Sequence, residues 1–484
     1  MQIDANDNAS PLPPASSRRV PLAAWWLAIP ATIILAHVWL MPQGVWVDEF
    51  FTFAWFKTLG WHGVWLRLIH WAPRPASELL VYLYYAATQI AHRPLVAPCL
   101  IVAWGTWIAA MVGAVKPWHG PARLARIALV LGLTSLSLLA APVLNLYYWP
   151  LAALAYLPSL GAASFAALTI CTGGLDRPQA RTGLCIALCI GACSVELGAT
   201  LALSASPLLA IAEWRNPAPN RISRILLALL PGLIAALVMV MLMHGRVPGE
   251  SNIGAGVTFH HGLLSLMAAA PVALGELTGS AYGLPGIAAA TATKLLFFAA
   301  ALVILCQGWP VRAARAPMLA VILGLAATFY ASIAGAFYTL GSGCCERHQS
   351  YRQAILFLII LALAAMLRPA RGLAFHRGLA PMLISASVMV TAPSRLSGIL
   401  VESRLAPLRA IARQTLFNSG YGLGGTITYP IAPTGPLLRY DVIPTGDFHH
   451  GPKPQHYIIE GALTYFNKSR LVVTAMPEKP AQVR

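Results

Sequence analysis

The sequence predicts an all-α polytopic membrane protein with about 11–13 transmembrane helices and a small C-terminal extracytoplasmic α/β appendage. Hydrophobic residues make up 58% of the 484-residue chain, charged residues only 10%, and the mean hydropathy is +0.67. Soluble domains carry about 25% charged residues. The net charge of +17 comes largely from arginines in short clusters between apolar runs. That pattern is typical of cytoplasmic loops and argues against nucleic acid as a partner.

The predicted membrane spans are apolar runs long enough to cross a bilayer of about 30 Å. They fall at 21–40, 95–115, 125–142, 147–171, 183–212, 225–243, 286–306, 317–340, 353–367 and 378–394. Basic clusters between alternate spans place the N-terminus in the cytoplasm and the C-terminus outside. We therefore divide the chain into a cytoplasmic tail (1–19), a transmembrane domain (20–394) with a first outer loop (41–77), and an extracytoplasmic C-terminal domain (395–484).

Two local features leave the topology partly open. The run Leu79–Ala91 is shorter than a typical span of about 20 residues, so either it does not cross fully or another short crossing lies between 44 and 93. The run 183–212 is too long for one simple crossing and contains Glu196. We predict two short helices with a tight turn at Ser194–Glu196. The loops 142–147, 194–196, 244–285 and 341–352 are then expected on the outer side, together with everything after about 395.

The last ninety residues differ in composition from the rest of the chain. A helical segment at about 400–417 precedes short runs of β-favouring residues separated by Gly and Pro. The predicted strands are Gly425–Tyr429, Leu438–Val442, Tyr457–Ile459 and Leu471–Thr474.

The sequence predicts no cofactor and no metal site. Cys185, Cys189 and Cys193 recur at four-residue spacing, but no His or acid joins them in a ligand motif. Small residues that pack helix against helix explain this stripe better. No phosphate-binding loop and no His-Glu-x-x-His helix is present. A divalent cation is compatible with the sequence, but no residue spacing supports one.

The first outer loop contains the most informative motif, the adjacent carboxylates Asp48 and Glu49, in a chain with only 16 acidic residues. Trp and Phe are dense in the following residues, which favours a helix lying at the membrane surface. On one interpretation Asp48 caps this helix and Glu49 complements its dipole. On the other, a carboxylate beside an apolar wall has a raised pKa and acts as a general base.

The combination of a first helix, an acidic pair opening an aromatic outer loop, many short spans and an outer C-terminal region resembles the GT-C class of membrane glycosyltransferases. The motif Val47-Asp48-Glu49 carries most of this resemblance. It implies an enzyme of the bacterial inner membrane that transfers a sugar from a polyprenyl-phosphate donor to an extracytoplasmic glycan, lipid or protein acceptor. Asp48 would be the catalytic base, and Glu49 its partner or a substrate ligand.

A leaving phosphate requires cationic stabilisation, for which guanidinium groups are well suited. The outer-side candidates are Arg74, Arg246, Arg347 and Arg352. Further candidates for substrate binding are His70, Glu196, His348 and Tyr351. Two alternatives remain open for these residues. The segment 341–352 would serve equally well as an ordinary solvated loop, and Glu196 would serve equally well as the ion-pair partner of an arginine.

Two other functions compete with the enzyme. A transporter or flippase for a lipid-linked saccharide would depend on charges along a path through the bundle, such as Glu196 and Lys294, but no internal repeat is visible. A non-catalytic envelope assembly protein would have the same fold without activity.

Overall fold

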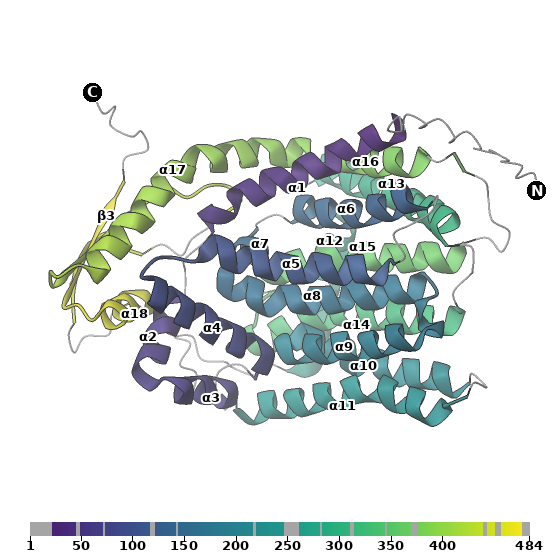
Figure 1. Ribbon diagram of the computed structural model, residues 1–484, viewed down its shortest axis with the longest axis horizontal. Coiled ribbons are helices and arrows are strands. Elements are labelled where there is room, and N and C mark those ends of the chain that lie inside the picture. The colour runs from purple at the N-terminus through teal and green to yellow at the C-terminus, as the bar shows by residue number, and fades with distance from the viewer. Residues whose placement is uncertain are drawn as a thin grey trace, which may run out of the picture.

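The computed structural model describes residues 22–44, 49–70, 73–116, 122–141, 144–215, 219–245, 261–280, 283–309, 314–343, 346–368, 375–376, 378–438, 443–450 and 456–476. The predicted tail 1–19 lies outside these residues. Most of the described chain is helical and forms a bundle whose long helices run side by side (Figure 1).

The N-terminal half contains short 3₁₀ turns and eleven α-helices. They are η1 (Leu22–Leu27), α1 (Ala28–Leu40), η2 (Met41–Gln43), α2 (Glu49–Leu59), α3 (Trp61–His70), α4 (Pro75–Ala91), α5 (Val96–Ala114), α6 (Arg123–Ala140), α7 (Asn145–Tyr148), α8 (Pro150–Cys171), η3 (Gly174–Asp176), α9 (Pro178–Ser194), α10 (Glu196–Trp214) and α11 (Arg221–Gly245).

The C-terminal half adds seven helices and a small sheet. These elements are α12 (Gly262–Thr278), α13 (Gly283–Gly308), α14 (Arg315–Leu340), α15 (Glu346–Leu367), α16 (Leu379–Thr391), α17 (Pro393–Tyr421), β1 (Thr426–Ile431), β2 (Gly446–His449), α18 (Tyr457–Phe466) and β3 (Arg470–Ala475).

Proline and glycine set many of the helix ends. Proline is the first residue of α4, α8, α9 and α17, where its missing N–H costs no helical hydrogen bond. Gly279 and Gly341 follow α12 and α14 with φ of 77° and 69°, a left-handed conformation that glycine adopts without steric strain.

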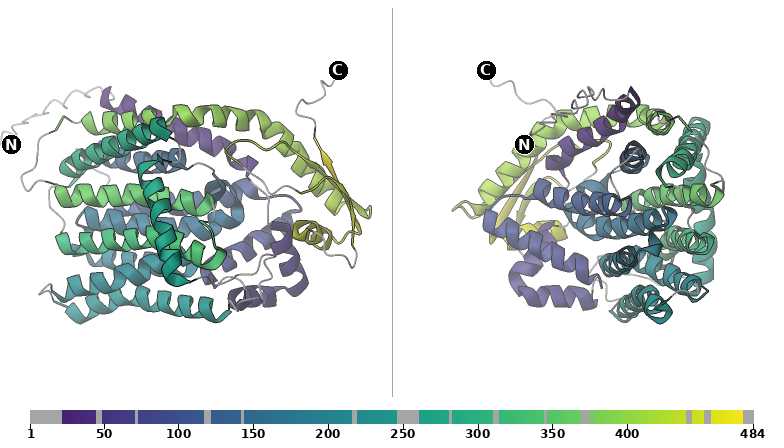
Figure 2. Two further views of the ribbon diagram at one scale, coloured as in Figure 1. Left: turned by 180° about the vertical axis from the view of Figure 1, so that it is seen from behind. Right: turned by 45° about the vertical axis from the view of Figure 1, so that its right-hand side comes forward.

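Nine of the described helices are long and apolar enough to cross a membrane, and the pair α16–α17, bent by 67°, would make ten. This is fewer than the predicted eleven to thirteen. The shortfall reflects α4 and α9, which have 17 residues each, against the roughly 20 that a straight crossing needs. The segment 244–285, predicted as an outer loop, contains the 17-residue helix α12. Figure 2 shows α12 running across the neighbouring helices rather than along them. The chain is thus a multi-pass helical membrane protein.

The segment between α1 and α5 leaves and re-enters the bundle at the same end. Gly44 follows η2, and an added Cβ there would lie only 2.4 Å from Cγ1 of Val96, the first residue of α5. Helices α2, α3 and α4 lie together at that end (Figure 1). Within the described residues of this segment no helix runs the length of the bundle, which favours the first alternative for Leu79–Ala91.

Contacts bring several of the segments predicted as outer loops together at this end of the bundle. The guanidinium of Arg74 binds Glu196, which connects the first outer loop to the 194–196 turn. Two more contacts connect the segments 142–147, 341–352 and the C-terminal region: Asn145 Nδ2 lies 3.3 Å from Glu346 Oε2, and Leu144 N donates to Leu437 O at 2.9 Å.

The predicted break at Glu196 is confirmed. Helix α9 ends at Ser194, Val195 is extended, and α10 begins at Glu196. The two helices approach so closely that an added Cβ at Gly198 would lie 2.0 Å from the carbonyl oxygen of Gly191. Small residues therefore form this interface, as expected for helices packed in a membrane, and Cys185, Cys189 and Cys193 are free thiols on α9.

The C-terminal region is a mixed three-stranded sheet in the order β1-β3-β2, with β1 and β3 parallel and β2 antiparallel to β3. Two predicted strands match β1 and β3, whereas Leu438–Val442 lies outside the described residues apart from Leu438. The predicted strand Tyr457–Ile459 is wrong, because these residues begin α18. Buried apolar side chains recur there at helical spacing, and this amphipathic face packs on α2.

Candidate functional site

Helix α2, which begins at Glu49 of the acidic pair, lies at the end of the bundle next to α18 and the sheet (Figure 1). Asp48 itself is outside the described residues. Glu49 is the first residue of α2, and its side chain is fully buried. Its position in the first turn suits the helix dipole, which agrees with a purely structural role for Glu49. Its burial beside apolar residues agrees equally well with a role in catalysis.

A cation from the C-terminal part of the chain contacts the residues that precede α2. We call the region around Gln43, Gly44 and Glu49 the acidic corner. Arg413, on α17, donates from Nη2 to Oε1 of Gln43 at 3.1 Å and from Nη1 to the carbonyl oxygen of Gly44 at 3.3 Å. Gln43 and Gly44 directly precede the segment that contains Asp48. Arg413 is not among the predicted site residues, because nothing in its local sequence indicates a contact with a residue 370 positions earlier.

Two tyrosines lie within range of both Glu49 and Arg413. Burial raises the pKa of Tyr84 well above its usual range; the Glu49 carboxylate adds to this shift and Arg413 opposes it. Burial likewise raises the pKa of Tyr429 on β1 to about 12, with Arg413 lowering it and Glu49 raising it. A carboxylate, a guanidinium and two neutral phenols therefore gather at this corner from α2, α17, α4 and β1.

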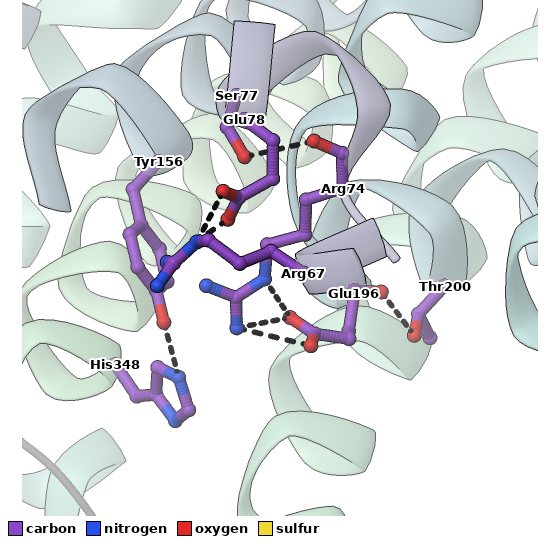
Figure 3. A network of polar contacts seen from close by, with 8 residues as sticks. All are labelled: Arg67, Arg74, Ser77, Glu78, Tyr156, Glu196, Thr200 and His348. Atoms are coloured by element: carbon purple, nitrogen blue, oxygen red, sulfur yellow. Dashed lines mark hydrogen bonds and ion pairs between the residues drawn. The ribbon is translucent and has the colours of Figure 1, made fainter. Parts of the chain in front are cut away.

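The second group of polar residues centres on Arg74, which precedes α4. Its Nε and Nη2 each donate to a different Glu196 carboxylate oxygen at 3.0 Å, and Nη2 also lies 2.8 Å from Oε2 (Figure 3). Burial lowers the pKa of Arg74, but Glu196, aided by Tyr156 and Glu78, outweighs it and raises the pKa above its usual value. This fork-to-fork geometry fixes the first outer loop on the start of α10.

The same network contains His348 and Tyr156. His348 Nε2 lies 2.7 Å from the hydroxyl of Tyr156, and His348 is within electrostatic range of Arg74 and Glu196. Figure 3 shows these side chains converging from α4, α8, α10 and α15. One turn further along α15, Tyr351 is within hydrogen-bonding distance of Ser159 at 2.7 Å. Four predicted site residues, Arg74, Glu196, His348 and Tyr351, thus lie in adjoining contacts.

A more deeply buried ion pair borders this network. Arg67 on α3 donates to the carboxylate of Glu78 on α4 at 2.7 and 3.3 Å, and both side chains are almost fully buried. Neither residue is among the predicted site residues. They are 11 positions apart on two consecutive helices, so their meeting depends on how α3 packs against α4. The pair holds α3 against α4 and so supports the loop that carries Arg74.

The remaining predicted arginines lie elsewhere. Segment 346–352, predicted as part of a loop, forms instead the first two turns of α15, which begins at Glu346. The polar side chains of this segment have partners in the bundle, so they do not need to face solvent. Arg352 binds Glu276 of α12, with Nε 2.8 Å from Oε2. Arg347 lies over the ring of Trp149, 5.1 Å from its centroid. Neither reaches the acidic corner.

Two predicted residues are not placed in side-chain detail. His70 is the last residue of α3, but its side chain is outside what the structure describes, and Arg246 lies outside the described residues altogether. In comparisons with known proteins, no family model matches the chain, and no curated protein or solved structure shows significant similarity to it.

Proposed function

We propose that this protein is a glycosyltransferase of the bacterial inner membrane, with a cytoplasmic N-terminus and an extracytoplasmic C-terminus. It transfers a sugar from a polyprenyl-phosphate donor to an extracytoplasmic glycan, lipid or protein acceptor. The observation that supports this most strongly is that the buried Glu49 carboxylate, next in sequence to Asp48, and Arg413 both lie within electrostatic range of Tyr84 and Tyr429.

The proposed step is an inverting displacement. The acceptor hydroxyl oxygen attacks the anomeric carbon while the bond from that carbon to the phosphate oxygen breaks. Asp48 takes the hydroxyl proton, and polyprenyl phosphate leaves with the bonding electron pair. Arg413 is the guanidinium best placed to stabilise that leaving charge, because it already contacts the backbone that leads into the acidic pair.

Glu49 and the network around Arg74 have supporting roles in this proposal. Glu49 orients the acceptor or its neighbour Asp48, and Arg74 with Glu196 holds the outer loop against α10. The transporter hypothesis has less support. Both charges that this hypothesis invokes already have partners: Glu196 is bound by Arg74, and Lys294 donates to the backbone carbonyl of Leu277.

The test is sugar transfer in proteoliposomes supplied with polyprenyl-phosphate hexoses and pentoses. Asp48→Asn should reduce transfer by about 100-fold or more, the usual contribution of a general base. Asp176→Asn provides a matched control, since Asp176 is exposed and lies in η3 at the opposite end of the bundle. Full transfer by a correctly inserted Asp48→Asn protein would refute the proposal.

Arg413 is tested separately through binding of the leaving group. Arg413→Gln should weaken binding of polyprenyl phosphate, whereas Arg413→Lys should restore part of it, because an ammonium keeps the charge but loses the fork. Equal affinity in all three proteins would remove Arg413 from the mechanism while leaving the role of Asp48 to the transfer assay.

A further inference from the structure

A pocket lies between helices α9, α10 and α11, with α14 at its edge. Its wall is mostly apolar and includes Leu188, Leu209 and Leu227, and its charged residues are Arg181, Glu213 and Arg224. Arg181 is near the start of α9 and Glu213 near the end of α10. The other ends of these helices meet at Ser194 and Glu196, so the pocket lies at the opposite end of the bundle from the proposed active site.

The charges at the pocket are unbalanced in favour of cations. Glu213 is paired with Arg224, and Arg221 lies over the ring of Trp214 at 4.2 Å. The half-buried guanidinium of Arg181 has no hydrogen-bond or ion-pair partner among the residues that the structure describes. Across 176–181 and 213–224 there are five arginines and two acidic residues. This end of the pocket therefore attracts an anion.

Helix α11 also presents an apolar face to the outside of the bundle. The pocket is lined by its residues Leu227 and Ala228, whereas Leu226, Leu230 and Leu233 lie on another face of the same helix and are exposed. In a membrane protein such a face lies against acyl chains, and a basic interhelical pocket near the end of the spans is typical of sites for acidic lipid headgroups.

We propose that this pocket binds one anionic glycerophospholipid. Its phosphodiester lies at Arg181, which supplies charge-assisted hydrogen bonds, and one acyl chain lies along the leucines of α9, α10 and α11. An anionic lipid fits better than a neutral one because Arg181 has no acidic partner in the described chain. A lipid fits better than free phosphate because most of the lining is apolar. The site is independent of the proposed transferase activity.

The test uses the full-length protein, purified in detergent and supplied with phosphatidylglycerol or phosphatidylcholine, with retained lipid counted by native mass spectrometry. The wild type should retain one phosphatidylglycerol in preference to phosphatidylcholine. Arg181→Gln should reduce that retention by about fivefold, the equivalent of about 1 kcal/mol for one basic residue near the membrane surface. Arg181→Lys should recover it.

Arg123→Gln is the matched control, because Arg123 is exposed at the start of α6 and does not line the pocket. A phosphatidylglycerol with a photoreactive acyl chain should crosslink to peptides of α9 and α11. Equal retention of the two lipids, equal loss in the Arg181 and Arg123 variants, or crosslinks confined to other helices would overturn the proposal. Displacement of the lipid by millimolar inorganic phosphate would also overturn it, because it would indicate a simple anion site.

Discussion

Breaking the Arg74–Glu196 ion pair should release the first outer loop from the bundle. The pair has three N–O contacts of 2.8 to 3.0 Å, and its side chains are 23% and 20% exposed. Removing one partner of a fully buried pair costs about 3–5 kcal/mol, whereas an exposed pair contributes at most about 1 kcal/mol. For this intermediate burial we expect about 2 kcal/mol, which is a change of about 30-fold in the opening equilibrium.

Hydrogen–deuterium exchange in nanodiscs measures this opening directly. Glu196→Gln should speed exchange of protected amides in α3 and α4 by about 30-fold, while amides in the middle of α8 keep their protection. Arg74→Gln should act similarly, and the double variant should cost less than the two single changes added together. Strictly additive effects, or unchanged protection in Glu196→Gln, would show that the pair does not hold the loop.

Two other parts of the C-terminal region give predictions. Gly461→Ala would place a Cβ 2.6 Å from the backbone nitrogen of Phe51, so α18 should shift away from α2 at a cost of about 1–3 kcal/mol, measured as a lower unfolding temperature. Gly424→Ala, with open space around it, should leave that temperature unchanged, and an equal effect of both changes would contradict the argument. The hydrogen bond from Arg470 lowers the pKa of Asp447. Stability from this exposed pair should therefore be present above the ordinary pKa of an aspartate, about 4, and be lost as the pH falls through the lowered value. Exchange of β2 and β3 should show this dependence, and Asp447→Asn should abolish it; an identical pH profile in the variant would contradict the assignment.

The sequence predicted local breaks well where one residue type dominates the energetics. A carboxylate in an apolar run is costly in a membrane, so Glu196 marked the turn between α9 and α10. The strand predicted at Tyr457–Ile459 is wrong because tertiary packing outweighs local preference there. The β-branched and aromatic residues favour a strand locally, but Ile458, Ile459 and Leu463 are buried together only when the segment is helical and packs against α2.

The candidate site could be predicted only in part. Arg74, Glu196 and His348 were identified as polar residues near helix ends, and they do converge. Arg352 was identified on the same grounds, yet it is bound by Glu276 of α12. A sequence pattern indicates which charged side chains would be unfavourable without a partner in an apolar bundle, but it does not identify the residue that pairs with each one.

By itself, the sequence determined that this chain is a multi-pass helical protein of the membrane, and it predicted which loops share a side. Apolar run length and the placement of arginines decide these features, and both are local properties of the chain. Only the tertiary structure decided that Arg413 lies beside the acidic corner and that Arg74 forms an ion pair with Glu196. These contacts join residues 370 and 122 positions apart, and their energies depend on three-dimensional distance and burial, which no local pattern encodes.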